Sequence, residues 1–264
     1  CEQGLGDSLA FSTLAEELAA RGEAFVLEAD RRLVAPISRA HPGWAVVAKE
    51  ESDAAFRSCD RHLPLGSLGR FFRRSVESFE RQPRAFLAAD PARAAAYRKR
   101  VAREGTRLVG ISWRTFQNRM RSYYERMRSA PLASFGDLSR SPGLTLLDLQ
   151  YGETGPEREA FGRDGGRLER IDELDLYNDL DGLVAAVDAC DLVVTTDNAT
   201  AHLAGATGKR TLLIYLSANP PAHYWAPTAH GHSRWYPSVE IVTGRDMDTW
   251  QRLLSRVQQI LAKS

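Results

Sequence analysis

Cysteine is scarce in this sequence: among 264 residues there are only Cys1, Cys59 and Cys190. An odd number without a CxxC pair argues against a disulfide framework and against a thiolate metal site, so we expect reduced, structural thiols and no bound metal. Long apolar runs are also missing, because no window approaches the ~18 residues that a membrane helix needs. The first four residues, CEQG, show no basic segment followed by an apolar one. We therefore expect no membrane span and a cytoplasmic location.

An excess of one charge is missing as well. Lys plus Arg number 35 and Asp plus Glu number 34, which leaves a formal net charge of +1. No global field then draws the chain to nucleic acid, which is excluded as an expected partner, and an anionic ligand has to be bound locally. The 43% apolar and 26% charged residues are typical of a globular chain of one or two domains.

The first part of the chain alternates between helical and strand patterns. A helix is predicted over 8–21, closed by Gly22, and is followed by a short strand at 25–27. A second helix over 31–40 and a second strand over 44–48 come next. A central strand normally precedes such a first glycine loop, and the sequence lacks one before Gly4.

A linker helix separates this part from the next. Asp90 is a good N-cap, Pro91 suits the first helical position and Gly105 can close the helix. Strands are predicted at 108–113, 144–149, 192–195 and 211–216, with helical stretches between them. Residues 248–263 form an amphipathic helix that we expect to cover one or both domains. The chain is α/β, with a first domain at 1–104 and a second at 105–264.

The first segment suited to chemistry is the glycine loop with Gly4, Gly6 and Asp7. Two glycines beside a helix start allow a ligand to approach the backbone, and the helix N-terminus offers unpaired N–H groups. The dinucleotide fingerprint fails, because Leu9 stands where its third glycine belongs. Asp7 could accept a proton from a substrate hydroxyl, or it could cap the helix.

The second segment is DLVVTTDNATAHLAGATGK, residues 191–209, a buried strand that runs directly into a helix rich in small residues. The first-turn amides of that helix would lie at the carboxyl end of the sheet, where a diphosphate binds. The alternative is an ordinary turn, with Asp197 or Asn198 as the N-cap and His202 as a hydrogen-bonded packing residue. A P-loop is excluded, because Arg210 follows Lys209 where Ser or Thr is required.

The third segment is ISWRT, residues 111–115, at the end of a predicted strand. Arg114 could hold a phosphate bidentately. The loop that follows carries Arg119, Arg121, Arg126 and Arg128, most of which we expect to be solvated. His230 and His232 lack a partnering Cys or carboxylate pair and are interpreted as loop residues.

The order of EQGLGD, GISWR, LQYGE, DLVVTTDNATAHLAGATGK and RWYPS resembles that of the family 9 glycosyltransferases. It is particularly similar to the heptosyltransferase-like domain of bacterial tetratricopeptide-repeat proteins. The resemblance covers nearly the whole chain. It implies a GT-B fold, in which two Rossmann-like domains face a cleft, with the acceptor on the first and the nucleotide-sugar donor on the second.

The resemblance also assigns residues. It places Asp7 at the general base, and it places Asp197 and His202 at the Asp-x4-His of the donor helix. The remaining donor-side positions that the resemblance implies are Ser112 and Arg114 in the phosphate-facing loop, Glu153 at the nucleoside, and Asn198, Ala199, Thr200 and Ala201 beside the diphosphate.

The predicted function is metal-independent, inverting transfer of a sugar from a nucleotide diphosphate sugar to a glycan, lipid-linked or protein hydroxyl. No cofactor is expected, and tetratricopeptide repeats upstream are the implied protein partner. Two alternatives stay open: a nucleotide-sugar epimerase of GT-B type, and a catalytically silent nucleotide-sugar-binding module.

Overall fold

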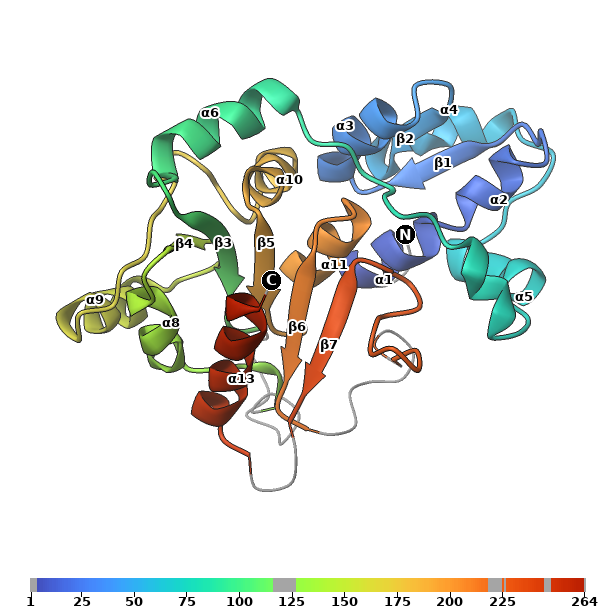
Figure 1. The fold of residues 1–264 in the computed structure, drawn as a ribbon. Coiled ribbons are helices and arrows are strands. Elements are labelled where there is room, and N and C mark those ends of the chain that lie inside the picture. The colour runs from blue at the N-terminus through green and yellow to red at the C-terminus, as the bar shows by residue number, and fades with distance from the viewer. Residues whose placement is uncertain (1–3, 116–126, 218–224, 226, 245–247, 264) are drawn as a thin grey trace.

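The computed structural model describes residues 4–115, 127–217, 225, 227–244 and 248–263 (Figure 1). Two parallel sheets organise these residues. The smaller sheet pairs β1 (Val26–Ala29) with β2 (Ala45–Ala48). The larger sheet contains β3 (Arg107–Ser112), β4 (Leu144–Asp148), β5 (Leu192–Thr195), β6 (Thr211–Tyr215) and β7 (Val239–Thr243). Its strands lie side by side in the order β4-β3-β5-β6-β7.

The helix predicted over 8–21 is wrong in its bounds. Two helices occupy this segment, α1 (Leu5–Ser12) and α2 (Ala15–Ala19), with a break at Thr13 and Leu14. At the break, Thr13 Oγ1 donates to the Ala10 carbonyl (2.6 Å) and accepts a hydrogen bond from Gln82 Nε2 (2.7 Å). This tertiary contact is invisible in the apolar spacing, which fits one continuous helix equally well.

The next elements lie where the sequence predicts them. Asp30 caps α3 (Arg31–Ala40) by accepting a hydrogen bond from Arg32 N. Asp90 caps α6 (Pro91–Val101) in the same way, and Gly105 beyond it adopts a φ of 71°. Polar caps and the left-handed preference of glycine are local properties, which explains why the sequence reports them.

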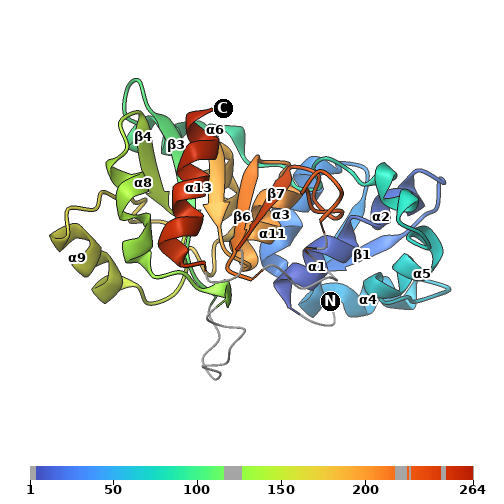
Figure 2. The same cartoon turned by 60° about the horizontal axis from the view of Figure 1, so that its bottom comes forward.

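Alternate residues of each central strand of the larger sheet pack into two different apolar layers. Val193 in β5 belongs to one layer, and its neighbours Leu192 and Val194 belong to the other. The first layer lies under α10 (Leu180–Ala189) and α11 (Ala199–Ala206), and the second lies under α8 (Gly136–Arg140) and α13 (Trp250–Ala262) (Figure 1; Figure 2 shows α8, α11 and α13 from another side). Side chains of a strand point alternately to opposite faces, so the sheet is covered on both sides.

The described residues form two units, one around the smaller sheet and one around the larger sheet, and the amphipathic C-terminal helix covers the second unit only. In the described residues, Leu253 and Val257 of α13 pack in the same apolar cluster as Ile111 and Ile214 of the larger sheet. Thr249 caps the helix by accepting a hydrogen bond from Arg252 N (3.4 Å). The apolar stripe therefore closes the outer face of the larger sheet.

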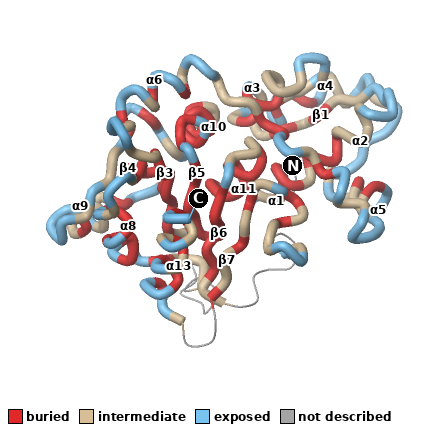
Figure 3. The backbone as a smooth tube through the Cα atoms, viewed as in Figure 1, coloured by how far each residue is buried: buried red, intermediate tan, exposed pale blue. Residues whose placement is uncertain are grey.

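The two units share one hydrophobic core. Leu9 of α1, Leu33 of α3 and Val187 of α10 belong to the same buried cluster, which runs from the smaller sheet to the inner face of the larger one (Figures 1 and 3). Arg39 of α3 forms a bidentate pair with Asp181 of α10 (2.8 and 3.1 Å), which reinforces this contact.

The remaining described elements are short or peripheral: η1 (Lys49–Glu51), α4 (Ser52–Arg57), η2 (Leu65–Leu68), α5 (Gly69–Phe72), η3 (Glu77–Arg81), η4 (Leu132–Phe135) and α9 (Gly155–Arg163). Among the helices of the described residues, none has the length and apolar character needed to cross a bilayer.

Candidate functional site

The larger sheet has a topological switch point between β3 and β5. From β3 the chain proceeds outward to β4, and it then returns to β5 on the opposite side of β3. In open α/β sheets, ligands bind beyond the carboxyl ends of the strands at such a point. Four predicted donor-side residues lie at these two strand ends: Ser112 is the last residue of β3, Arg114 follows it, and Asp197 and Asn198 follow β5.

Asn198 joins the two strand ends. Its Nδ2 donates to Ser112 Oγ (2.8 Å) and to the Arg114 carbonyl (3.3 Å). Its Oδ1 accepts hydrogen bonds from Thr195 Oγ1 (3.2 Å) and from the N–H of Ala201 (3.3 Å), which makes Asn198 the N-cap of α11. The capping role is the alternative that the sequence left open, and it holds for Asn198.

Gln150 completes this buried network, and sequence reasoning missed it. Its Oε1 accepts hydrogen bonds from Ser112 Oγ (3.0 Å) and from the N–H groups of Trp113 and Arg114 (both 2.9 Å). Its own N–H donates to Asp148 Oδ1 (2.9 Å). The only signal in the sequence is its place in LQYGE; its role depends on the neighbouring strand, which no local pattern reports.

The N-terminal turn of α11 holds three of the four residues predicted beside a diphosphate, and the fourth, Asn198, is its N-cap. Ala199 is half-buried, whereas Thr200 and Ala201 are buried. Thr200 Oγ1 donates to the Leu149 carbonyl (3.3 Å), and the Ala201 N–H is engaged by Asn198 through both its carbonyl and its side chain. The dipole of this helix favours an anion at its N-terminus.

Asp197 is 2% exposed and forms an ion pair with Arg128, whose Nε lies 2.7 Å from Asp197 Oδ2. Arg128 Nη2 also donates to the Asp197 carbonyl (3.2 Å). Arg128 is therefore not among the solvated arginines that we expect for most of this loop, because a buried carboxylate needs a cationic partner. The predicted loop residues Arg119, Arg121 and Arg126 lie outside the described residues.

Arg114 is partly exposed, and its guanidinium is paired with one acidic side chain and one backbone carbonyl. Its Nε lies 3.0 Å from Glu157 Oε1, and its Nη2 donates to the Glu153 carbonyl (2.7 Å). Trp113 Nε1 donates to the same Glu157 carboxylate (2.6 Å). The structure thus brings together Arg114 and Glu153, two of the predicted residues, through the backbone of Glu153 rather than its exposed side chain.

A cavity of about 350 Å³ opens beside Glu153 at the carboxyl end of β4. Polar and aromatic side chains line much of it, among them Asp148, Gln150, Tyr151, Glu153, Arg158, Arg170 and Tyr177. Burial raises the pKa of Asp148 to about 6, partly offset by the Gln150 N–H and by the charges of Arg158 and Arg170. The Asp148 carboxyl group is therefore about half protonated at a pH of about 6.

The first turn of α1, which contains Gly6, meets α11 at His202. A Cβ atom built on Gly6 would lie 2.6 Å from His202 Nε2, so only glycine fits at this position. Asp7 follows directly, and one of its carboxylate oxygens accepts a hydrogen bond from the N–H of Gly4, the N-cap of α1 (3.2 Å). His202 is 4% exposed, and its Nδ1 lies 3.1 Å from the Tyr236 hydroxyl.

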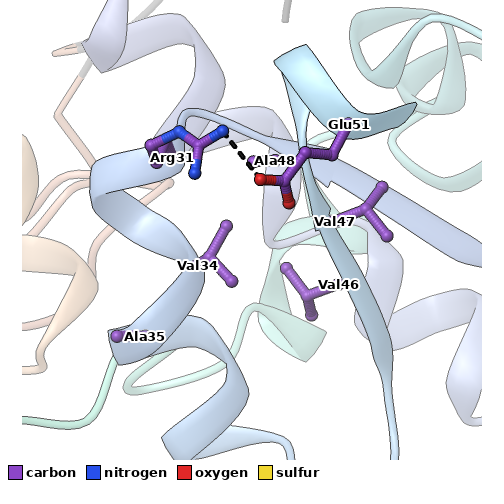
Figure 4. A pocket seen from close by; sticks show the side chains of 7 residues that line it. All are labelled: Arg31, Val34, Ala35, Val46, Val47, Ala48 and Glu51. Atoms are coloured by element: carbon purple, nitrogen blue, oxygen red, sulfur yellow. Dashed lines mark hydrogen bonds and ion pairs between the residues drawn. The ribbon is translucent and has the colours of Figure 1, made fainter. Parts of the chain in front are cut away.

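A second cavity of about 360 Å³ lies away from all these residues, between α3 and β2 (Figure 4). Val34, Val46 and Val47 form its apolar wall, and an ion pair between Arg31 and Glu51 (2.8 Å) crosses its end. It contains none of the predicted site residues.

No group of three or more His, Cys, Asp or Glu side chains in the described part of the chain is arranged to hold a metal ion. His232 Nδ1 forms a hydrogen bond with the Pro237 carbonyl (3.0 Å) in a loop.

Known structures share this arrangement of sheets. The ADP-heptose LPS heptosyltransferase II of E. coli is similar over 98% of this chain and 96% of its own, with a TM-score of 0.63 and 12% identity. A family 9 glycosyl transferase from Veillonella parvula is similar over 99% of this chain and 95% of its own, with a TM-score of 0.62 and 11% identity. The chain therefore has the GT-B fold of these enzymes, as the sequence predicted. No family model matches the chain.

A relative in sequence is the protein FlbA of Caulobacter vibrioides, which is 30% identical over 279 aligned residues. The match includes 98% of this chain but 45% of FlbA, so the chain spans less than half the length of that relative.

Proposed function

We propose that this chain is a glycosyltransferase that moves a sugar from a nucleotide diphosphate sugar to a hydroxyl acceptor, with inversion and without a metal ion or cofactor. The contact of Gly6 with His202 carries the proposal, because it sets Asp7 beside the donor helix at the switch point of the larger sheet. In this proposal, residues 1–104 present the acceptor and residues 105–264 bind the donor.

The donor would bind in two parts. The diphosphate would lie at the N-terminal turn of α11, where helix N–H groups and the Arg128 guanidinium, held by Asp197, supply positive charge. The nucleoside would occupy the cavity beside Glu153. Preorganised donors of this kind can each contribute about 3 kcal/mol to a developing anion.

Asp7 would act on the acceptor. Its carboxylate removes the hydroxyl proton while the oxygen attacks the anomeric carbon from the face opposite the leaving diphosphate, which inverts that carbon. The acceptor would be a hydroxyl group of a glycan, of a lipid-linked molecule or of a protein. Upstream tetratricopeptide repeats in a longer protein would help to select it. A cytoplasmic location is part of the same proposal.

The test compares Asp7→Asn and Arg114→Ala with the wild-type chain. Binding of ADP-, UDP- and GDP-sugars is measured by thermal shift, since a ligand specific to the folded state raises the Tm. Transfer is then measured with labelled donor and a cell extract as acceptor. Asp7→Asn keeps an oxygen for the Gly4 N–H, so we expect intact folding and donor binding with transfer reduced ~100-fold or more. Arg114→Ala is expected to weaken donor binding.

Asp137→Asn is the matched control, because the Asp137 side chain is 81% exposed and forms an ion pair with Arg140 on its own helix. Unchanged transfer in both site variants would overturn the proposal. An epimer of the donor formed without acceptor would instead favour the epimerase, and tight binding without donor consumption would favour the silent module.

A further inference from the structure

Exposed apolar side chains are concentrated in one stretch of the first unit. Four large apolar side chains are exposed in the described residues, and three of them, Leu63 (51%), Phe71 (62%) and Val76 (54%), lie between residues 63 and 76. This stretch contains η2 and α5, and α5 lies at the end of the molecule remote from α9 (Figures 1 and 2). Single exposed apolar residues are normal, whereas a concentration of them marks an interaction site.

Basic side chains accompany these apolar residues. Residues 57–84 include seven arginines and three acidic residues, in a chain whose net charge is +1. Arg70 and Arg74 are exposed, and neither forms an ion pair with a carboxylate of the described residues. The basic end of α6 differs, because its arginines pair with carboxylates of the second unit, as Arg100 does with Glu173. The positive charge near α5 is therefore available to an external anion.

Neighbouring residues of the same types have a role in the fold. Phe72, beside Phe71, is 6% exposed and belongs to the shared core. Arg73, beside Arg74, has a side chain that is only 3% exposed and forms an ion pair with Glu17. Phe72 and Arg73 thus fix this segment in place, and the exposed Phe71 and Arg74 side chains are left for a partner.

We propose that residues 63–76, which we call the α5 surface, dock on a membrane that contains anionic phospholipids. Single apolar side chains such as Phe71 can insert at the boundary between headgroups and acyl chains, while guanidinium groups bind the headgroup phosphates. Arg70 and Arg74 would make these phosphate contacts. The attraction is local and needs no net charge on the whole chain, because it falls off within a Debye length. This inference goes beyond the proposed function, since docking on lipid requires neither donor nor acceptor.

The test measures co-sedimentation of the full chain with vesicles of phosphatidylglycerol and phosphatidylcholine, and with vesicles of phosphatidylcholine alone. We expect stronger binding to the anionic vesicles, and we expect added salt to weaken it. One arginine near an anionic surface changes binding about fivefold, so Arg70→Gln combined with Arg74→Gln should weaken it about 25-fold. Phe71→Ser should weaken binding about fivefold or more. The Tm of these variants should equal that of the wild type, because the altered side chains are exposed.

Arg163→Gln combined with Arg252→Gln is the matched control for charge. Both arginines are exposed, on α9 and α13 of the second unit, and neither pairs with a carboxylate within the part of the chain that the structure describes. The control removes the same charge away from the α5 surface, so we expect binding close to that of the wild type.

A Phe71→Trp variant reports insertion directly. Its added tryptophan should be quenched by brominated phosphatidylcholine in the anionic vesicles. The wild-type chain supplies the background, because most of its own tryptophans are buried.

Equal binding to both kinds of vesicle, or to neither, would overturn the inference, as would equal losses in the two double variants. Polyglutamate tests the other class of partner. If it bound the wild type but not the Arg70→Gln, Arg74→Gln variant, and no vesicle bound, the α5 surface would be a site for an acidic protein and the membrane proposal would be wrong. A chain that binds anionic vesicles but no nucleotide sugar contradicts the proposed function and leaves this inference intact.

Discussion

Single side chains at the carboxyl ends of β3, β4 and β5 hold the candidate site together. Asn198 and Gln150 each satisfy backbone and side-chain partners from neighbouring strands, and both are buried. A buried polar group without a partner costs about 1–3 kcal/mol, so such a network fixes one arrangement of the strand ends. The site is accordingly shaped before any ligand arrives.

Asp148 makes the stability of this region depend on pH. Its pKa is raised from the usual 3.8 to about 6 by burial, so the folded chain retains a proton that the unfolded chain releases between these values. The free energy of unfolding therefore falls as the pH rises from about 4 to 6. Above that range the contribution of Asp148 to this free energy is constant. A shift of about 2 pH units corresponds to ~3 kcal/mol.

We predict that Asp148→Asn removes this dependence. The amide oxygen still accepts the Gln150 N–H, whereas the group no longer titrates. In urea titrations, the stability of the variant relative to wild type should rise by about 1 kcal/mol or more between pH 5 and 7. Asp137→Asn, on an exposed side chain, serves as the control. A difference from wild type that stays constant over this pH range would contradict the prediction.

At the scale of helices and strands, the sequence predicts the elements that have a strong local signal and misses or merges those whose bounds depend on tertiary contacts. The strands at 192–195 and 211–216 are runs of buried apolar and β-branched residues, and the structure places β5 and β6 there within one residue. The apolar pattern does not single out β7 or α10, and it fits one helix over α1 and α2, because the bounds of these elements depend on partners far along the chain.

The same division applies to the site. The sequence identifies the strand ends at which Ser112, Arg114, Asp197 and Asn198 lie, so their gathering at one edge of the sheet is predictable. The pairing of Arg128 with Asp197 is not, since nothing in the basic loop distinguishes one arginine from another. The roles of the predicted residues in catalysis stay predictions.

The contact between α1 and α11 gives an element-level test. Alanine normally stabilises a helix by about 0.5–1 kcal/mol relative to glycine. At Gly6 the added Cβ would meet the His202 ring at 2.6 Å, and that ring is held by Tyr236 and Trp225. We predict that Gly6→Ala destabilises the chain by about 1–3 kcal/mol in thermal or urea unfolding.

Gly162→Ala provides the comparison, because Gly162 lies in α9 with no atom within 4 Å of the added Cβ. This variant should be neutral or more stable than wild type. If both variants gained stability, α1 would not be seated on His202 as described.

At the scale of the whole molecule, the shared core connects the two units. The buried cluster that contains Leu33 of α3 continues through α10 to the inner face of the larger sheet, and Arg39 with Asp181 links the same elements. A domain with its own core could unfold alone. Here, unfolding of the first unit would also expose the buried apolar side chains of α10 and α11 to water. The smaller sheet, with two parallel strands in the described residues, depends on this support.

We therefore predict one cooperative unfolding transition, with equal calorimetric and van't Hoff enthalpies. Leu33→Ala, at a residue 2% exposed, should lower the stability of the whole chain by about 2–4 kcal/mol. Amide exchange in β5 should accelerate together with that in β1, since both are protected by the same core. Leu253→Ala in the outer cluster should shift the same single transition. Two separated transitions, with Leu33→Ala moving only one of them, would show that the two units unfold independently and that their shared core does not couple them.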